Sequence, residues 1–267
     1  MFTRLTNDSY GSLAALPLKT FPLIAAVLEG RQSGAVFSDA AETIFIVSKS
    51  GFSFLWSPDS ALDVEAFTTF LVGSHAVPQY LHIYDPPPTL VAYLRQKPEQ
   101  FGMKLRTRIQ LQYRKEQISP AEFRPLSTAE FQEITSENLR DLDALDLDIG
   151  DRFWDSESHF LKDGYGLYLQ AETVAPVAVC YAAGIGNGLA EVDIHTSPDH
   201  QKNGFAKYAA ALFIQQGLRR GIRTNWDCFE DNVGSLKTAL ALQFTAVKNY
   251  PLLSIYLKEK ENEISAT

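Results

Sequence analysis

Apolar and polar residues alternate in the second half of the chain with the period of a strand. Over residues 189–196, Val192 and Ile194 fall on one face of the expected strand, and Glu191 and Asp193 fall on the other. Apolar residues of the next segment recur at helical spacing. The expected elements of this half are helices over 128–147, 205–218 and 235–242, a shorter helix that carries Phe153, Trp154, Phe160 and Leu161, strands over 165–170, 174–183, 189–196 and 222–228, and one or two strands over 244–257.

The first half of the chain predicts a similar order of elements. Its expected helices lie near 12–28, 62–72 and 90–95, and its expected strands over 35–37, 43–48, 52–56, 80–84 and 104–113. Because the order of elements recurs, we predict a structural duplication. It is degenerate, since no sequence repeat is visible. The fold class is α/β with a mixed sheet. We expect one domain over residues 1–120 and a second over 121–267, separated near Ser119-Pro120.

Composition is that of an ordinary globular protein. The 267 residues are 45% hydrophobic and 21% charged, which excludes general disorder and leaves enough apolar residues for a real core. Cys180 and Cys228 lie in apolar runs and predict reduced, buried thiols in a cytoplasmic protein. The first residues lack the apolar stretch of a signal peptide, and no apolar run approaches the ~20 residues of a membrane span. We therefore expect no membrane association.

The net charge of −8 is carried by the second half, because residues 1–125 are nearly neutral. This balance argues against nucleic acid as a partner and favours a cationic small molecule. Ser127 and Glu130 form a capping-box signature that opens the helix expected over 128–147. Acidic residues crowd the stretch 141–157 that follows. That stretch is either a solvated helix face and loop or an entrance that attracts a protonated amine.

The segment after the strand at 189–196 is the most informative for chemistry. Gln201-Lys202-Asn203-Gly204-Phe205-Ala206 turns through a glycine into a helix. Backbone N–H groups at a helix start bind anions, and a glycine there lets a phosphate approach the backbone closely. The segment therefore predicts a diphosphate cradle, with an ordinary strand–loop–helix turn as the alternative.

Gln201, Gly204 and Ala206 also match the phosphate loop R/Q-x-x-G-x-G/A of the GNAT N-acetyltransferase superfamily. The downstream residues Trp226-Asp227-Cys228 and Asn232, together with Pro22-Leu23-Ile24 upstream, resemble the branch typified by zwittermicin A resistance acetyltransferases. The clear resemblance covers about residues 150–257. One departure is Gln243 in Leu242-Gln243-Phe244, where the family has a helix-ending glycine. Gln243 predicts a different helix end.

The resemblance implies acetyl-CoA as donor, bound by the C-terminal domain. The N-terminal half has no such glycine loop where its third strand meets its helix, at Ser57-Pro58-Asp59-Ser60, so we expect no CoA site there. The resemblance also implies that the backbone of the strand pairs with the pantetheine arm, that a free N–H polarises the thioester carbonyl, that Asn232 holds the cofactor arm or its loop, and that Ser235 caps the next helix. The cofactor-binding residues expected are Ile194, His195, Thr196, Gln201, Lys202, Asn203, Gly204, Phe205, Ala206, Asn232 and Ser235.

Acetyl transfer to an alkyl ammonium also needs a group that accepts a proton. Glu191 and Asp193 lie on one face of the donor-binding strand, and Glu191 is favoured because it lies further from the phosphate loop. Both could equally be rim carboxylates. The tyrosine that many superfamily members carry seven residues after Asn232 is replaced by Ala239. Tyr250 is the substitute candidate for the acid, with a filler of the core or rim as the alternative.

Three functions remain open. The first is an N-acetyltransferase that acetylates an amine of a small, cationic acceptor by direct attack in a ternary complex, with an N-terminal half that helps to shape the acceptor pocket. The second is a non-catalytic acyl-CoA-binding sensor or structural module. The third is transfer of a longer acyl group. The five histidines show no metal-ligand spacing with the cysteines, so no metal is expected. A homodimer is left open as the assembly.

Overall fold

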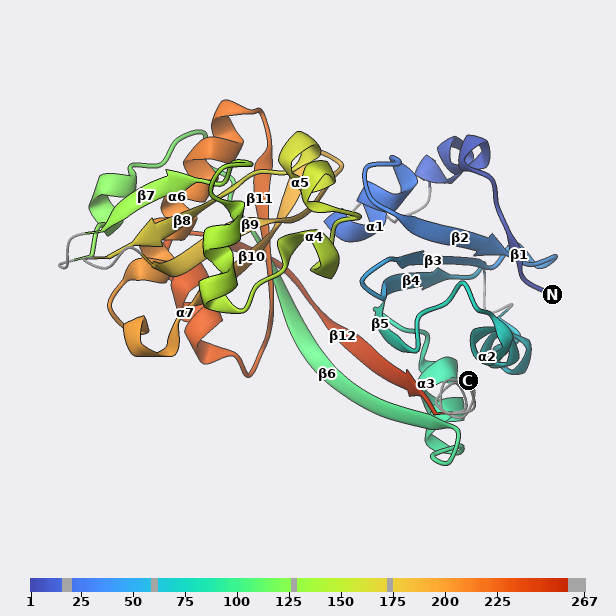
Figure 1. Ribbon diagram of the computed structural model, residues 1–267. Helices are drawn as coiled ribbons and strands as arrows, with labels where there is room; N and C mark the ends of the chain where they lie inside the picture. The colour runs from blue at the N-terminus through green and yellow to red at the C-terminus, as the bar shows by residue number, and fades with distance from the viewer. Residues whose placement is uncertain (16–20, 59–61, 126–128, 172–174, 259–267) are drawn as a thin grey trace. The chain divides into compact units, whose positions relative to one another are not determined.

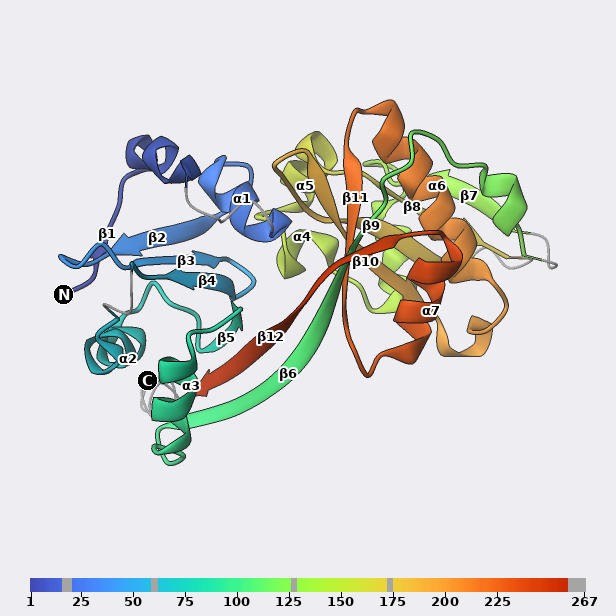
Figure 2. The same cartoon turned by 180° about the vertical axis from the view of Figure 1, so that it is seen from behind.

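The computed structural model describes residues 1–15, 21–58, 62–125, 129–171 and 175–258. It divides into two compact units (Figures 1 and 2). We call Met1–Arg108 with Asn249–Thr267 the N-terminal unit and Ile109–Lys248 the C-terminal unit. This division departs from the domains expected over 1–120 and 121–267, because the last strand of the chain pairs with strands of the first half and so returns to the N-terminal unit.

The N-terminal unit builds a mixed sheet. β2, β3 and β4 form an antiparallel meander, β4 and β5 are parallel, and β5 pairs antiparallel with β12. Two long strands, β6 and β12, contribute residues to both units. The elements are β1 (Thr3–Arg4), η1 (Asn7–Ala15), α1 (Pro22–Leu28), β2 (Gly34–Ser38), β3 (Ile44–Ser48), β4 (Phe52–Trp56), α2 (Val64–Gly73), β5 (Tyr80–Tyr84), α3 (Pro88–Arg95), β6 (Phe101–Gln112) and β12 (Thr245–Leu257).

The central strand β3 explains how this sheet is covered. Every residue of β3 is buried, as expected for a strand with elements on both faces. Phe45 and Val47 join the core formed with α2 and α3, and α1 packs against β3 and β4. The helix expected near 12–28 is shorter than predicted, since α1 begins at Pro22, a residue favoured in the first helical turn. Residues 16–20 of that prediction lie outside the described residues.

The strands of the C-terminal unit also pair in mixed directions. β7 to β10 are antiparallel neighbours, β10 and β11 are parallel, and β6 follows β11. The elements are η3 (Pro120–Phe123), β7 (Glu130–Glu133), η4 (Leu139–Leu145), α4 (Ile149–Arg152), α5 (Glu157–Asp163), β8 (Gly166–Gln170), β9 (Pro176–Gly186), β10 (Leu189–Thr196), η5 (Pro198–His200), α6 (Phe205–Arg219), β11 (Arg223–Phe229) and α7 (Val233–Ala241).

The helix expected over 128–147 is wrong. Residues Glu130–Glu133 form the edge strand β7, because backbone pairing with β8 outweighs a local helical preference. The Asn138 side chain then accepts a hydrogen bond from the Thr135 N–H at 2.8 Å and ends the strand in a turn. Ser127 of the predicted capping box lies outside the described residues.

The long helix α6 covers one face of the C-terminal sheet, and Figure 2 shows it in orange beside the strands. Apolar residues of α6 pack on alternate residues of β8 and β9, such as Leu167 and Cys180. Val192 and Ile194 of β10 pack against the same core. Glu191 and Asp193 therefore point to the opposite face, as the alternation predicted. Both cysteines are described, buried and outside any disulfide, and burial raises the pKa of the Cys180 thiol, as expected for a core residue.

The end of α7 corrects one expectation. Gln243 takes the left-handed conformation, with φ of 66°, although it is not glycine. The Phe244 N–H donates to Ala239 and the Gln243 N–H donates to Leu240, which is the Schellman pattern. Lys115 donates to the Gln243 side chain. The helix thus ends as it would with glycine.

Candidate functional site

The two parallel strands β10 and β11 pair over a short length and then separate. Their register joins Leu189, Ala190 and Glu191 to Arg223, Thr224 and Asn225. Beyond that point β10 continues to Thr196 and β11 to Phe229 without further pairing between them. The strands therefore diverge after the pair Glu191–Asn225.

Backbone N–H and C=O groups of β10 face the side from which β11 separates. The Ser197 N–H donates to the Val177 carbonyl of β9 at 2.9 Å. In an antiparallel ladder only alternate residues exchange hydrogen bonds with their partner strand. Val192, Ile194 and Thr196 therefore turn their backbone N–H and C=O groups away from β9, toward the side from which β11 has diverged.

The loop between β10 and α6 is held by its own polar side chains. Gln201 Nε2 donates to the Thr196 carbonyl at 3.3 Å, and the Ser197 hydroxyl lies 2.8 Å from His200 Nδ1. Gly204 stands at the N-cap of α6 in the left-handed conformation, with φ of 89°. Among the described residues, no side chain caps this helix start. The N–H groups of the first turn and the positive end of the helix dipole could therefore bind an anion.

The turn between β11 and α7 closes the other side. Asn232 Oδ1 accepts a hydrogen bond from the Ser235 N–H at 3.1 Å, so Asn232 is the N-cap of α7. Ser235 Oγ accepts a hydrogen bond from Trp226 Nε1 at 3.0 Å. The expectation that Ser235 caps the helix is therefore wrong. Its backbone receives the cap, and its hydroxyl anchors the indole.

These elements surround a cavity of about 500 Å³. Ten of the eleven predicted cofactor-binding residues line it, and Asn203 is the exception. The structure adds five lining residues that are not among the eleven, namely His200, Lys207, Trp226, Gly234 and Thr238. Strand alternation could have located Trp226, because it lies on the same face of β11 as the core residue Cys228. The lining residues are Ile194, His195, Thr196, His200, Gln201, Lys202, Gly204, Phe205, Ala206, Lys207, Trp226, Asn232, Gly234, Ser235 and Thr238.

Comparison with known proteins identifies the family. A family model described as GNAT acetyltransferase matches residues 91–253, which is more than half of the chain. The chain belongs to the GNAT acetyltransferase family. The uncharacterized N-acetyltransferase YdfB of Bacillus subtilis is 32% identical over 103 residues, which span 38% of this chain and 39% of that protein. The match thus covers less than half of either chain.

Solved structures share the GNAT fold along nearly the whole chain. A GCN5-related N-acetyltransferase-like protein from Streptococcus suis is 17% identical with a TM-score of 0.69, over 93% of this chain and 98% of its own. A GCN5-related N-acetyltransferase from Sphaerobacter thermophilus is 13% identical with a TM-score of 0.59, over 95% and 94%. A tandem GNAT protein from the clavulanic acid biosynthesis pathway is 11% identical with a TM-score of 0.59, over 95% and 97%.

The predictions of a mixed α/β fold and of a GNAT acetyltransferase are thereby confirmed. The zwittermicin A resistance branch stays a prediction. The GNAT family uses acetyl-CoA as donor. Three features of the cavity fit such a ligand. The start of α6 has no side-chain cap, Lys202 and Lys207 lie on the cavity lining, and Thr196 Oγ1 is shielded with no hydrogen-bond partner among the described residues.

The two carboxylates proposed as bases have different surroundings. Glu191 is buried and accepts a hydrogen bond from Asn225 Nδ2 at 2.7 Å. Asp193 Oδ2 accepts a 2.6 Å hydrogen bond from the Tyr181 hydroxyl and lies 3.0 Å from Arg152 Nη1. Burial raises the pKa of Tyr181, and the Asp193 carboxylate adds to that rise. Tyr181 therefore stays a donor, and Asp193 is engaged on one oxygen by two groups.

Tyr250 belongs to the N-terminal unit. Its ring is only 2% exposed and packs on Phe21, with centroids 5.1 Å apart, and on Tyr84, with centroids 5.8 Å apart. These contacts are those of an aromatic core residue. They favour the alternative reading of Tyr250 over a role as acid.

The acidic stretch is largely engaged within its own unit. The Tyr168 hydroxyl donates to Asp141 at 2.7 Å, and Arg140 pairs with Glu157 at 2.8 Å. Burial raises the pKa of Tyr168, and its bond to Asp141 adds to that rise, so the hydroxyl remains a donor.

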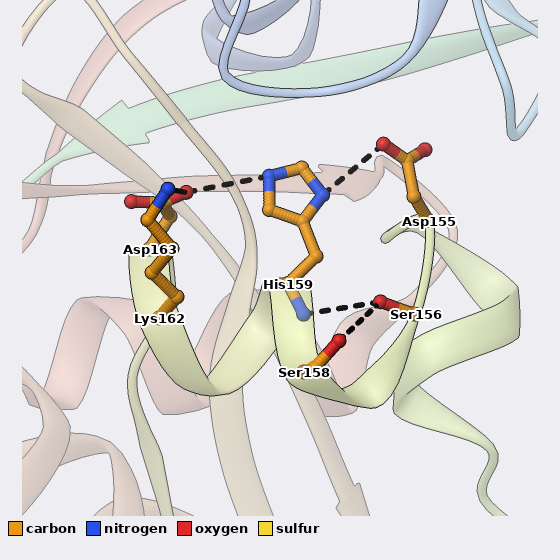
Figure 3. A network of polar contacts seen from close by, with 6 residues as sticks. All are labelled: Asp155, Ser156, Ser158, His159, Lys162 and Asp163. Carbon is orange, nitrogen blue, oxygen red and sulfur yellow. Dashed lines mark hydrogen bonds and ion pairs between the residues drawn. The ribbon is translucent and has the colours of Figure 1, made fainter.

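Two more carboxylates of this region face a histidine on α5. Figure 3 shows the His159 ring between Asp155 and Asp163, with nitrogen–oxygen distances of 3.1 and 3.4 Å. Ser156 caps the helix by accepting a hydrogen bond from the His159 N–H. Asp141, Asp155 and Glu157 of the stretch 141–157 are thus turned toward local partners, which supports the reading of a solvated helix face for these three carboxylates.

Within the described ranges, no three His, Cys, Asp or Glu side chains are grouped so as to hold a metal ion. Among those same residues, no helix has the length and apolar character that a bilayer crossing requires.

Proposed function

We propose that this chain transfers an acetyl group from acetyl-CoA to an amine of a small-molecule acceptor, by direct attack in a ternary complex. The observation that carries the proposal is the cavity between the diverging strands β10 and β11, which ends at the uncapped start of α6. A donor with a diphosphate at one end and a thioester at the other has complementary groups along this path.

Each part of the cavity supports one part of the donor. The turn before α6 would bind the diphosphate through backbone N–H groups, and the β10 backbone would pair with the pantetheine amides. Asn232 would act through the turn that it caps. The residues proposed for donor binding are Ile194, His195, Thr196, Gln201, Lys202, Asn203, Gly204, Phe205, Ala206, Asn232 and Ser235.

The chain's own groups then supply two functions at the reacting end. Backbone N–H groups of β10 that face the divergence can donate to the thioester oxygen and stabilise negative charge there. Glu191, at the start of the divergence, is the proposed base that takes the proton of the attacking ammonium, directly or through water. The new carbon–nitrogen bond replaces the carbon–sulfur bond, and the CoA sulfur leaves as a thiolate that takes up a proton.

Glu191 is preferred to Asp193 as the base, because Arg152 and Tyr181 already engage one Asp193 oxygen. Tyr250 is not given the role of acid, since its ring packs inside the aromatic core of the N-terminal unit. The acceptor's amine follows from the family's chemistry. The protein's net charge of −8 supports a positively charged acceptor. The pairing of carboxylates within the acidic stretch weakens that support.

The test combines calorimetry with a thiol-release assay on an amine library. We expect wild type to bind CoA and to release thiol with at least one amine. Glu191→Gln should lower turnover by about 100-fold or more while changing CoA affinity by less than about threefold. Glu130→Gln, an exposed glutamate of the edge strand β7, is the control and should behave as wild type.

Three results would redirect the proposal. CoA binding without turnover on any amine would favour a non-catalytic binding module. Turnover with longer acyl donors alone would change the donor. No affinity for CoA or acetyl-CoA would contradict the function altogether.

A further inference from the structure

Three buried polar side chains form a hydrogen-bonded chain across the C-terminal sheet. Asn225 Nδ2 donates to Glu191 Oε2 at 2.7 Å, and Gln110 Nε2 donates to Asn225 Oδ1 at 3.1 Å. Gln110 and Asn225 are fully buried, and Glu191 is 6% exposed. They come from β6, β11 and β10, respectively. Buried polar groups in such a chain constrain one another's orientation.

Elementary hydrogen-bond chemistry fixes which atoms donate and which accept among these three side chains. An ionised carboxylate only accepts hydrogen bonds, so the amide nitrogen of Asn225 has to face Glu191. The Asn225 carbonyl then faces β6 and needs a donor, which Gln110 provides. Gln112 Nε2 lies 3.5 Å from the same oxygen and adds little at that distance. The glutamine thus holds Asn225 in the orientation that favours the ionised form of Glu191.

The position of these three side chains in the fold connects them with the proposed reaction. Glu191 and Asn225 are the last paired residues before β10 and β11 diverge, and Glu191 precedes Ile194 of the cavity lining by three residues on β10. We infer that Asn225 is a positioning residue that holds Glu191 as an ionised proton acceptor, with Gln110 fixing the Asn225 amide. The inference rests on the proposed function, in which Glu191 is the base.

Other charged groups lie on the same face of the two strands. Asp193 lies two residues beyond Glu191 in β10, and Arg152 of α4 and Tyr181 of β9 engage its carboxylate. Asp227 lies two residues beyond Asn225 in β11. These groups are unchanged in the variants below, so a difference between variants reports on the Asn225 contact.

The experiment compares Asn225→Leu with wild type. Leucine has the branching and the number of side-chain heavy atoms of asparagine but donates no hydrogen bond, so the ionised form of Glu191 loses a stabilising donor. We expect the acid limb of kcat/KM against pH to move upward by about one pH unit or more, and activity below that limb to fall by about tenfold. CoA affinity by calorimetry should change by less than about threefold. Gln112→Leu is the matched control and should leave the limb in place.

A second variant covers a failure of Asn225→Leu to fold. Asn225→Asp keeps the shape of the side chain but places a second carboxyl against Glu191, which should move the limb in the same direction. In the Glu191→Gln background neither Asn225 variant should lower turnover further. An unmoved limb in a folded variant, or an additional loss in the Glu191→Gln background, would reduce Asn225 to a structural residue.

A measurement that needs no turnover separates this inference from the proposed function. Carbon-13 NMR of glutamate carboxyl groups, with Glu191→Gln assigning the signal, follows the titration midpoint of Glu191 directly. A midpoint that rises in Asn225→Leu supports the positioning role even if no amine is acetylated, and an unchanged midpoint overturns it. Absence of thiol release in wild type counts against the proposed function alone.

Discussion

In each unit, a loop and a helix connect two parallel strands. The starts of these two helices differ in the groups that occupy them. In the C-terminal unit, α6 begins at Gly204 with no side-chain cap. In the N-terminal unit, α2 begins at Asp63, whose carboxylate accepts a hydrogen bond from the Ala66 N–H at 3.0 Å, and Glu65 follows in the first turn. A protein carboxylate thus takes the place in α2 that a ligand anion could take in α6.

The space beside the strand pairs differs as well. In the N-terminal unit, the last pair of β4 and β5 is Phe54–Tyr84. Phe21 stacks on Tyr84 with centroids 4.2 Å apart and also contacts Phe54, while Tyr250 packs on both Phe21 and Tyr84. Aromatic rings therefore fill this region, whereas a cavity follows the last pair of β10 and β11. The same arrangement of two parallel strands, a loop and a helix supports a binding site only where side chains leave the helix start and the strand edge accessible.

The largest effect is expected at the helix start of the C-terminal unit. Gly204→Asp forces a side chain into φ of 89° and places a negative charge at the proposed diphosphate site. We expect CoA affinity to fall by about 100-fold or more in calorimetry. Gly221→Asp is the control, because Gly221 also has positive φ and open space around it but does not line the cavity. Equal losses in both variants would contradict the cradle.

The next effect concerns a histidine of the N-terminal unit. Burial, with Arg108 and Arg106 nearby, lowers the pKa of His82 from 6.5 to about 4. The unfolded chain therefore binds this proton first, and the free energy of unfolding should fall as pH drops from about 6.5 to about 4. After a discount for the part-exposed ring, the loss is roughly 1 to 2 kcal/mol.

Urea unfolding at several pH values measures this loss. His82→Phe keeps the ring contact with Phe52 and should remove the His82 share of the pH dependence. An identical pH profile in the variant would show that His82 is not responsible.

A pair of cap variants tests the comparison of helix starts directly. Asp63→Ala and Asn232→Ala each remove an N-cap side chain, and each should lower the free energy of unfolding by about 1 kcal/mol. Only Asn232→Ala should also weaken CoA binding, because Asn232 lines the cavity of the C-terminal unit. A loss of CoA affinity in Asp63→Ala would undo the assignment of binding to one unit.

The smallest effect is a gain in stability at the end of α7. Gln243→Gly should raise the free energy of unfolding by about 0.5 to 1 kcal/mol, since glycine takes positive φ without a steric cost. Gln243→Ala keeps the strained conformation and should show no gain. Thermal unfolding of the two variants makes the comparison.

Parts of the candidate site could be predicted because they are local in sequence. Strand alternation placed Glu191 and Asp193 on one face, and the glycine loop before Phe205 indicated an anion site. The cap of α7 was assigned to the wrong residue, because Asn232 and Ser235 are both good caps and only the backbone path selects between them. The pairing of Asn225 with Glu191 had no local signal, since 34 residues separate them.

The sequence by itself determined the helix and strand periods, the glycine turn before α6 and the family, because these depend on neighbouring residues and local motifs. Tertiary structure decided that residues 130–133 are an edge strand, that the last strand returns to the N-terminal unit and that Tyr250 lies among aromatic rings. Those outcomes depend on backbone pairing and packing between distant segments, whose energies exceed local preferences.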